Sequence, residues 1–233
     1  MAGDKVTDKC TCCSSFSEWC RCVDGVEPSL HSIKRIFTLL VQYLFSDKDR
    51  LSGLSEALAC RTYSSDKSET GLNIAPATVI DPGGTEVVPA ILIQASNDGV
   101  KFEKIAMDPS VHESPDYASN TEVWKCDVVL QFRCLDRNGD VSGMMADALM
   151  LFLTSLRRGL LGRVPWLKEY VPVEITEPKL IKSEIDDTSS DKWYESIVAV
   201  QITYIYSVFV ATESKRLKDF SLYPEGEPGN NRS

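Results

Sequence analysis

The chain has 233 residues, of which 43% are hydrophobic and 25% charged, and this predicts a soluble protein with one extended domain or two small ones. Its net charge of −9 argues against tight binding to DNA phosphates, which needs clustered Lys and Arg, although an acidic wall leaves passing DNA mobile. The amino terminus shows no apolar signal segment, and the most apolar stretch, residues 196–211, is too short and too polar for a transmembrane helix. We therefore expect a protein of the cytoplasm with no membrane contact.

Five of the eight cysteines lie near the amino terminus, at Cys10, Cys12, Cys13, Cys20 and Cys22. Their C-x-C spacing differs from the C-x2-C to C-x4-C spacing of common zinc sites. We interpret residues 1–27 as a Cys-rich, Ser-rich arm with free thiols, and zinc binding and disulfide formation stay open as alternatives. The other three, Cys60, Cys126 and Cys134, lie in helix or strand patterns and are expected to be small core or surface residues.

The first periodic segment, residues 28–45, places apolar residues at three- and four-residue spacing, which predicts an amphipathic helix. A short helix over residues 51–60 and a weak strand over residues 73–80 follow. Residues 87–96 and 100–107 predict two further strands. Residues 108–120 are rich in Pro, Ser and Asp and predict an exposed loop.

The clearest strand pattern is "EVWKCDVVLQFRC", residues 122–134, in which Trp124, Cys126 and alternate residues after them are expected to face the core. A helix is expected over residues 142–162, a strand interrupted by Pro178 over residues 171–185, and a last long strand over residues 193–210. The order predicts an α+β domain over residues 28–211, with a largely antiparallel sheet and helices packed on one face. Residues 212–233 are expected to be a polar tail.

The segment "CLDRNGDVSGMMADAL", residues 134–149, begins like a calcium loop, with Asp136, Asn138 and Asp140 at alternate positions. An EF-hand loop requires a preceding helix, Gly at its sixth position and usually Glu at its twelfth. Here a strand precedes, and those positions hold Val141 and Asp147. We interpret the segment as a turn, with positive φ angles at Asn138 and Gly139 and with Asp140 or Ser142 capping the next helix.

No sequence motif points to catalysis. The chain lacks a G-x-S-x-G elbow, a phosphate-binding Gly-Lys-Ser/Thr loop, a dinucleotide fingerprint and an H-E-x-x-H helix. His31 and His112 have no partner in the sequence pattern, and Asp186 and Asp187 are typical of a solvated turn. We expect no enzyme activity, no cofactor and no bound metal.

Three stretches, "VPAILIQ", "TEVWKCDVVLQFRCLDRNGDVSGMMADALMLFLTSL" and "WYESIVAVQITYIYSVFV", together resemble the tail terminator (tail completion) proteins of long-tailed bacteriophages. The resemblance extends over about residues 28–210 and rests on the order of elements, since no invariant motif is present. It implies a ring of six subunits that ends polymerisation of the tail tube and joins the tail to the head, with no catalytic residue.

The partners implied are further copies of the chain, the tail tube protein, a neck or head-completion protein and, in a contractile tail, the sheath. The protein would lie in the virion after assembly in the host cytoplasm, and DNA would pass through the ring without specific binding. The Cys-rich arm, the loop at residues 108–120 and the polar tail depart from the family pattern. The sequence leaves open whether the tail contracts and which surface meets which partner.

Two strands carry apolar residues on both faces, which indicates surfaces that neighbouring copies bury. The candidate subunit-interface residues are Val123, Val129, Ile197, Ile205 and Phe209. Two alternatives stay open. One is another neck or head–tail connector protein, and the other is a protein-binding adaptor domain with a zinc-held arm.

Overall fold

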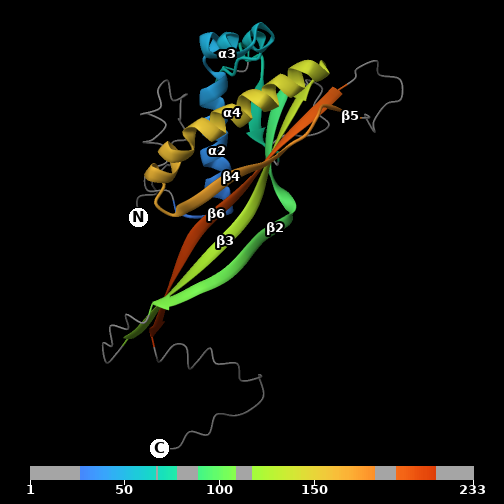
Figure 1. Cartoon of the computed structure of the whole chain (residues 1–233). Helices are drawn as coiled ribbons and strands as arrows, with labels where there is room; N and C mark the ends of the chain where they lie inside the picture. The colour runs from blue at the N-terminus through green and yellow to red at the C-terminus, as the bar shows by residue number, and fades with distance from the viewer. Residues whose placement is uncertain (1–26, 67, 78–88, 109–116, 182–192, 214–233) are drawn as a thin grey trace, which may run out of the picture.

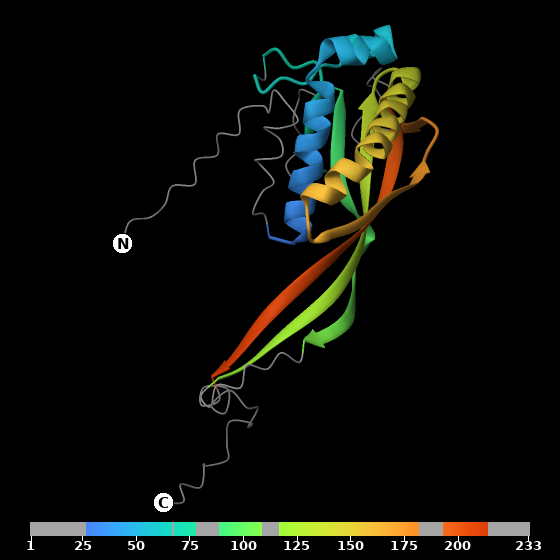
Figure 2. The ribbon, with the colours of Figure 1, turned by 60° about the vertical axis from the view of Figure 1, so that its left-hand side comes forward.

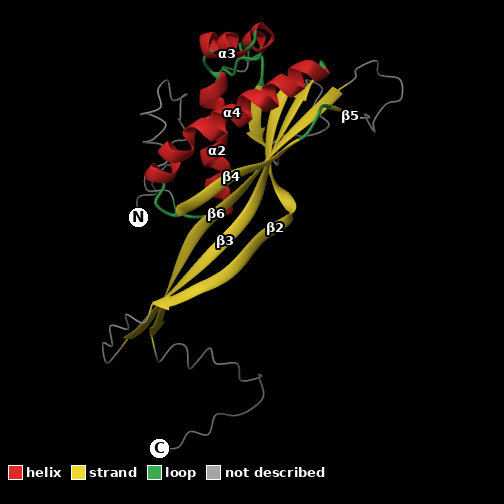
Figure 3. Ribbon diagram, in the orientation of Figure 1, coloured by secondary structure: helices red, strands yellow, loops and turns green. Residues whose placement is uncertain are grey.

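The computed structural model describes residues 27–66, 68–77, 89–108, 117–181 and 193–213, so nearly all of the expected arm and tail lie outside it. The described residues form an α+β fold, as predicted, in which helices cover one face of a six-stranded, mostly antiparallel sheet (Figures 1 and 3). Residues 109–116 of the predicted loop lie outside the described residues. Residues 117–120 belong to a strand, so the loop prediction was wrong for them.

The helical layer consists of α2 (Leu30–Phe45), the short α3 (Lys48–Leu54), a 3-10 turn η1 (Glu56–Cys60) and α4 (Gly139–Arg163). Ser29 caps α2 by accepting a hydrogen bond from the Ser32 amide. The apolar stripe of α2 is buried along its whole length, as the helical spacing predicts. The second helix, predicted over residues 51–60, is divided between α3 and η1.

The sheet has the order β1-β2-β3-β6-β4, and β5 also pairs with β6. The strands are β1 (Asn73–Pro76), β2 (Ala90–Asp108), β3 (Tyr117–Asp136), β4 (Leu167–Ile175), β5 (Lys179–Ile181) and β6 (Trp193–Glu213). Only β1 and β2 pair in parallel, and the other pairs are antiparallel. The break at Pro178 that the sequence predicts separates β4 from β5.

The core lies between the helices and the sheet face that carries the even-numbered residues of β3 and β6. Phe37 of α2 makes edge-to-face contacts with Phe132 of β3, at 5.9 Å between ring centroids, and with Tyr170 of β4, at 5.7 Å. Cys126 and Cys134 are buried in this core and Cys60 is exposed, in agreement with the expectation for these three thiols.

Two strand predictions were wrong in detail. Residues 87–96 and 100–107 do not form separate strands, because β2 continues through an irregularity between Ala95 and Val100. Gly99 has a φ of +71° there, and this conformation costs a residue with a Cβ atom far more than it costs glycine. Residues 96–99 therefore form an irregularity within one strand and do not separate two strands.

The helix start was also predicted wrongly. Asn138 is the N-cap of α4, and its side chain accepts a hydrogen bond from the Asp140 amide at 2.9 Å. Neither Asn138 nor Gly139 has a positive φ. Ser142 does not cap the helix either, since its hydroxyl is buried and donates to the carbonyl oxygen of Cys134. The helix passes Gly159 and Gly162 and ends at Arg163.

Part of the sheet extends beyond the helices. The strands β2, β3 and β6 continue together, away from α2 and α4, as a twisted three-stranded ribbon (Figures 1 and 2). We call residues 102–108, 117–126 and 204–213 the distal sheet. The last residue of β6 that pairs with β4 is Tyr204, so the described part of the distal sheet has three strands.

Candidate assembly surface

The segment that resembles a calcium loop is organised around a buried ion pair. Asp136 is fully buried at the end of β3, and its carboxylate accepts hydrogen bonds from Arg61 Nε at 2.5 Å and Arg61 Nη2 at 3.3 Å. The Asn138 amide donates to the same carboxylate at 2.9 Å. Asp136 therefore joins the turn to the segment after η1. Among the described residues there is no group of three or more His, Cys, Asp and Glu side chains placed to hold a metal ion.

The buried thiols are poorly suited to nucleophilic chemistry. Burial raises the pKa of the Cys134 thiol far above its ordinary value. Burial also raises the pKa of Cys126, although its contact with Tyr204 partly offsets this effect. Both side chains are therefore protonated at neutral pH, when the reactive form of cysteine is the thiolate.

The predicted interface residues that can be placed lie on one face of the sheet, opposite the helices. Val123 pairs with Ser207, Val129 with Gln201, Ile197 with Arg133 and Ile205 with Lys125, and paired residues share a face. All four side chains are half-buried. Phe209 pairs with Thr121 through the backbone, but its side chain lies outside the described part of the structure.

Polar pairs separate these apolar residues. Arg133 forms an ion pair with Glu195, Thr203 donates a hydrogen bond to Asp127 at 2.5 Å, and Lys125 lies 3.2 Å from Asp127 and 3.6 Å from Glu103. The hydrogen bond and charge of Asp127 raise the pKa of Lys125. The open face is thus a mixed surface, whereas the sequence pattern alone predicts apolar patches.

The other face of the distal sheet carries aromatic side chains that the helices do not reach. Phe102 is 61% exposed and Tyr206 is 39% exposed, and they lie on the same face as Trp124. The Lys104 ammonium lies 5.7 Å from the centroid of the Trp124 ring. Trp124, which sequence periodicity placed on the core side, is half-buried and packs against the core. Ile105, at a second register shift in β2, is 52% exposed.

Nearer the helices, this aromatic face becomes buried. The Trp166 ring lies edge-to-face on Tyr204 at 6.1 Å between centroids. Burial, followed by the neighbouring Cys126, raises the pKa of Tyr204 to about 12. Trp166 therefore closes the core at the point where the distal sheet begins.

The distal sheet has two edges without a described neighbouring strand. On one side, β1 pairs only with Ala90–Ile93 of β2. On the other, β4 pairs with β6 only as far as Tyr204, and the Ile205 amide then donates to the carbonyl oxygen of Trp166 at 2.8 Å. Backbone groups beyond these points face outward within the described residues.

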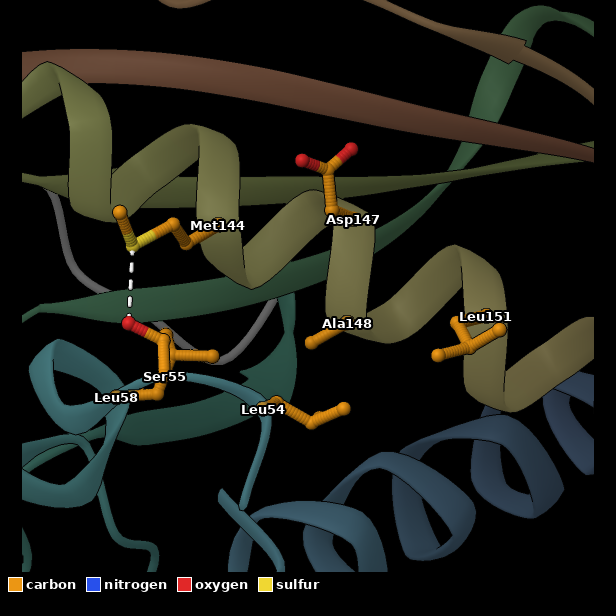
Figure 4. A pocket seen from close by; sticks show the side chains of 7 residues that line it. All are labelled: Leu54, Ser55, Leu58, Met144, Asp147, Ala148 and Leu151. Carbon is orange, nitrogen blue, oxygen red and sulfur yellow. Dashed lines mark hydrogen bonds between the residues drawn. The ribbon is translucent and has the colours of Figure 1, made fainter. Parts of the chain in front are cut away.

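A groove of about 200 Å3 lies on the helical side, between the α3–η1 segment and α4 (Figure 4). Leu54, Met144 and Leu151 are exposed along it. Ser55 donates a hydrogen bond to the Met144 sulfur at 3.3 Å, while the Asp147 carboxylate points away from this contact (Figure 4). The groove is apolar and open, and it has the character of a protein contact more than of a catalytic site.

No family model and no curated protein sequence matches this chain. Within the described residues, no helix is both long and apolar enough to cross a membrane.

Proposed function

We propose that this chain is a structural virion protein that forms a ring at the head-proximal end of a bacteriophage tail. The ring ends polymerisation of the tail tube and offers a joining surface to the neck or head. The distal sheet carries this proposal, because it is a long, three-stranded surface with exposed apolar side chains that a single copy leaves uncovered. Such surfaces are typical of proteins that assemble.

The order of the elements supports the proposal. The opening helix α2, the Pro-led strand β2, the long strand β3, a short turn, the helix α4 and the final long strand β6 occur in the order that the resemblance to tail terminators implies. Further elements lie between them: α3, η1 and β1 before β2, and β4 and β5 before β6. The net charge of −9 is compatible with a ring through which DNA slides without binding. Its expected partners are the tail tube protein, a neck or head-completion protein and, in a contractile tail, the sheath.

The groove between α3 and α4 favours a second candidate, a protein-binding adaptor. Its exposed Leu54, Met144 and Leu151 suit the apolar side chains of a partner. The two candidates differ in the surface that is essential. A ring depends on the distal sheet, while an adaptor depends on the helical groove.

The test uses the virus that encodes the chain, with this gene deleted. We expect tails of uncontrolled length that fail to join heads, as seen by electron microscopy, and restoration when the intact gene is supplied. Tails of normal length joined to heads in the absence of the protein would refute the proposal.

Complementation with two variants then separates the candidates. Ile205→Asp places a carboxylate opposite Lys125, which favours a folded subunit, but it disturbs the distal sheet surface. We expect it to fail in complementation although its melting curve stays cooperative. Leu151→Asp, a matched apolar-to-acid change at the groove, should restore normal tails. The reverse outcome would favour the adaptor.

A further inference from the structure

We propose that copies of this chain join by continuing their β-sheets, with the β6 edge of one copy pairing in parallel with the β2 edge of the next. The segments involved are residues 205–213 of β6 and residues 102–108 of β2. This inference rests on the proposed ring and specifies the contact that closes it.

The β6 edge lacks the features that keep an edge strand from pairing. Residues 205–212 contain no charged residue, no proline and no glycine. Their pairing with β3 is regular, without a register shift from Tyr194 to Glu213. Edge strands of monomeric proteins are usually protected by charges, prolines or bulges. An unprotected edge of this length is therefore expected to have a neighbour.

The backbone groups of this edge are suitably oriented. The Ile205 amide points away from β3, since it donates to Trp166 at 2.8 Å. Backbone groups alternate in direction along a regular strand, so the amides and carbonyls of residues 207, 209, 211 and 213 also point away from β3. A strand added at this edge would satisfy all of them.

The β2 edge lies at the same level of the distal sheet, on the opposite side. Lys104 pairs with Trp124, which pairs with Tyr206, so the two edges are separated by one strand. Both β2 and β6 are antiparallel to β3 and therefore run in the same direction. A rotation that carries one copy onto the next about an axis along the strands preserves this direction, so the two edges meet as parallel strands.

Side chains at the two edges complement each other. Among the described side chains of the distal sheet, Phe102 on β2 and Tyr206 on β6 are exposed aromatics, and both lie on the face of Trp124. Sheet continuation brings Tyr206 of one copy near Phe102 of the next and covers both. Two charged residues of β2 do not obstruct this contact, because Glu103 faces Lys125 and Lys104 lies over Trp124. The β2 edge is less regular than the β6 edge, since it carries a register shift between Lys104 and Ala106.

A head-to-tail arrangement is favoured over a two-fold one. Pairing of two β6 edges about a two-fold axis would leave both β2 edges, with Phe102 and Ile105, exposed. Head-to-tail pairing uses both edges of every copy, and closure into a ring removes all edges of the distal sheet.

Engineered cysteines test the contact. Ser207→Cys on β6 is combined with Glu103→Cys on β2 in one variant and with Lys101→Cys on β2 in another. The two variants test two registers of the contact between copies, which differ by two residues. The cysteines of residues 10–22 and Cys60 are first replaced by serine in the full chain, and ring formation is confirmed. Positions 103 and 207 of one chain are two strands apart, about 10 Å, which exceeds the reach of a disulfide. Any bond between them therefore joins two copies.

We expect oxidation of tails carrying a double variant to give a ladder of covalent multimers up to the hexamer. Ser207→Cys alone should give none. Covalent dimers from Ser207→Cys alone would overturn the head-to-tail contact in favour of a two-fold one. Rings that form normally but yield no ladder with either pair would overturn the sheet contact and leave the proposed function intact.

A proline provides the second test. Ser207→Pro removes an amide that points away from β3, so the intact β3–β6 pairing should survive, as proline is tolerated at open edges. We expect its melting curve to match that of Ser207→Ala, while its yield of rings falls at least tenfold. Normal rings from Ser207→Pro would overturn the proposal. Absence of rings from the unaltered protein, in virions as well as in solution, would refute both this inference and the proposed function.

Discussion

Asp136, the first acidic residue of the segment that resembles a calcium loop, has a structural role. Its carboxylate is fully buried and holds Arg61, which lies 75 positions earlier in the chain. The same carboxylate accepts the Asn138 amide and so fixes the turn before α4. Desolvating a carboxylate is costly, and the arginine and the amide offset that cost. Asp136, the first residue of the alternating pattern, therefore stabilises the fold.

The ion pair between Arg61 and Asp136 predicts an effect on the free energy of unfolding. Arg61→Ala leaves a buried carboxylate without its charged partner and should lower the free energy of unfolding by about 3 kcal/mol. Urea denaturation at pH 7 measures the change. Arg157→Ala is the control, because its ion pair with Glu169 is exposed on both sides and should contribute less than about 1 kcal/mol. Equal losses in the two variants would contradict the role assigned to Asp136.

Among the elements, α4 and β4 are joined by a buried hydrogen bond. The Tyr170 hydroxyl donates to the carbonyl oxygen of Leu153 in the middle of α4, at 2.5 Å. The Tyr170 ring also contacts Phe37 of α2, so a single side chain of β4 touches both long helices. Burial raises the pKa of this phenol well above its ordinary value of 10.0.

The raised pKa predicts loss of stability at high pH. Below about pH 10 the phenol is protonated in both states, and the folded protein keeps the full contribution of Tyr170. Above pH 10 the unfolded chain releases the proton while the folded protein retains it, so the free energy of unfolding falls as pH rises. We expect Tyr170→Phe to cost about 1 kcal/mol at pH 8 and to reduce the fall between pH 8 and pH 11.

Urea denaturation at the two pH values checks this expectation. The exposed Tyr206→Phe serves as the control at pH 8, where it should change the free energy by less than about 0.5 kcal/mol. An equally steep alkaline fall in the Tyr170→Phe variant and in the unaltered protein would show that Tyr170 is not the group responsible.

In the whole molecule, the sheet is longer than the layer of helices that covers it. The distal sheet meets the described core at Cys126 and Tyr204 and extends from there beyond the helices (Figure 2). Within the described residues, a monomer therefore has a part that the helices cover and a part that they do not. Under the proposed function, neighbouring copies would cover the second part.

The core boundaries predict that the amino-terminal arm is dispensable for folding. Deleting residues 1–25 removes no residue of the described core. The melting temperature should change by no more than about 3 °C, since terminal segments outside a core usually contribute little to stability. Calorimetry of the truncated and full-length chains measures this. An insoluble truncated chain, or one zinc ion per intact chain by elemental analysis, would show that the Cys-rich arm is structural.

The candidate surface was predictable in part. Alternation along β3 and β6 correctly placed Val123, Val129, Ile197 and Ile205 on the face away from the helices, because side-chain direction in a strand follows from parity alone. Whether neighbouring copies bury these residues stays a prediction. The exposure of Tyr206 was missed, because this residue has the same parity as the core residues and only the length of the helical layer separates it from them, whereas Trp124 is half-buried and packs against the core.

The sequence by itself determined the class of the fold and the existence of the long helices and strands. These features follow from local periodicity, which each segment carries independently of the others. Tertiary structure alone decided that β2 is one strand, that Arg61 neutralises Asp136, and that the described helices leave the distal sheet uncovered. Each of these features depends on residues far apart in the chain or on the extent of a packed layer. A local sequence pattern predicts neither the distant contacts nor the extent of the layer.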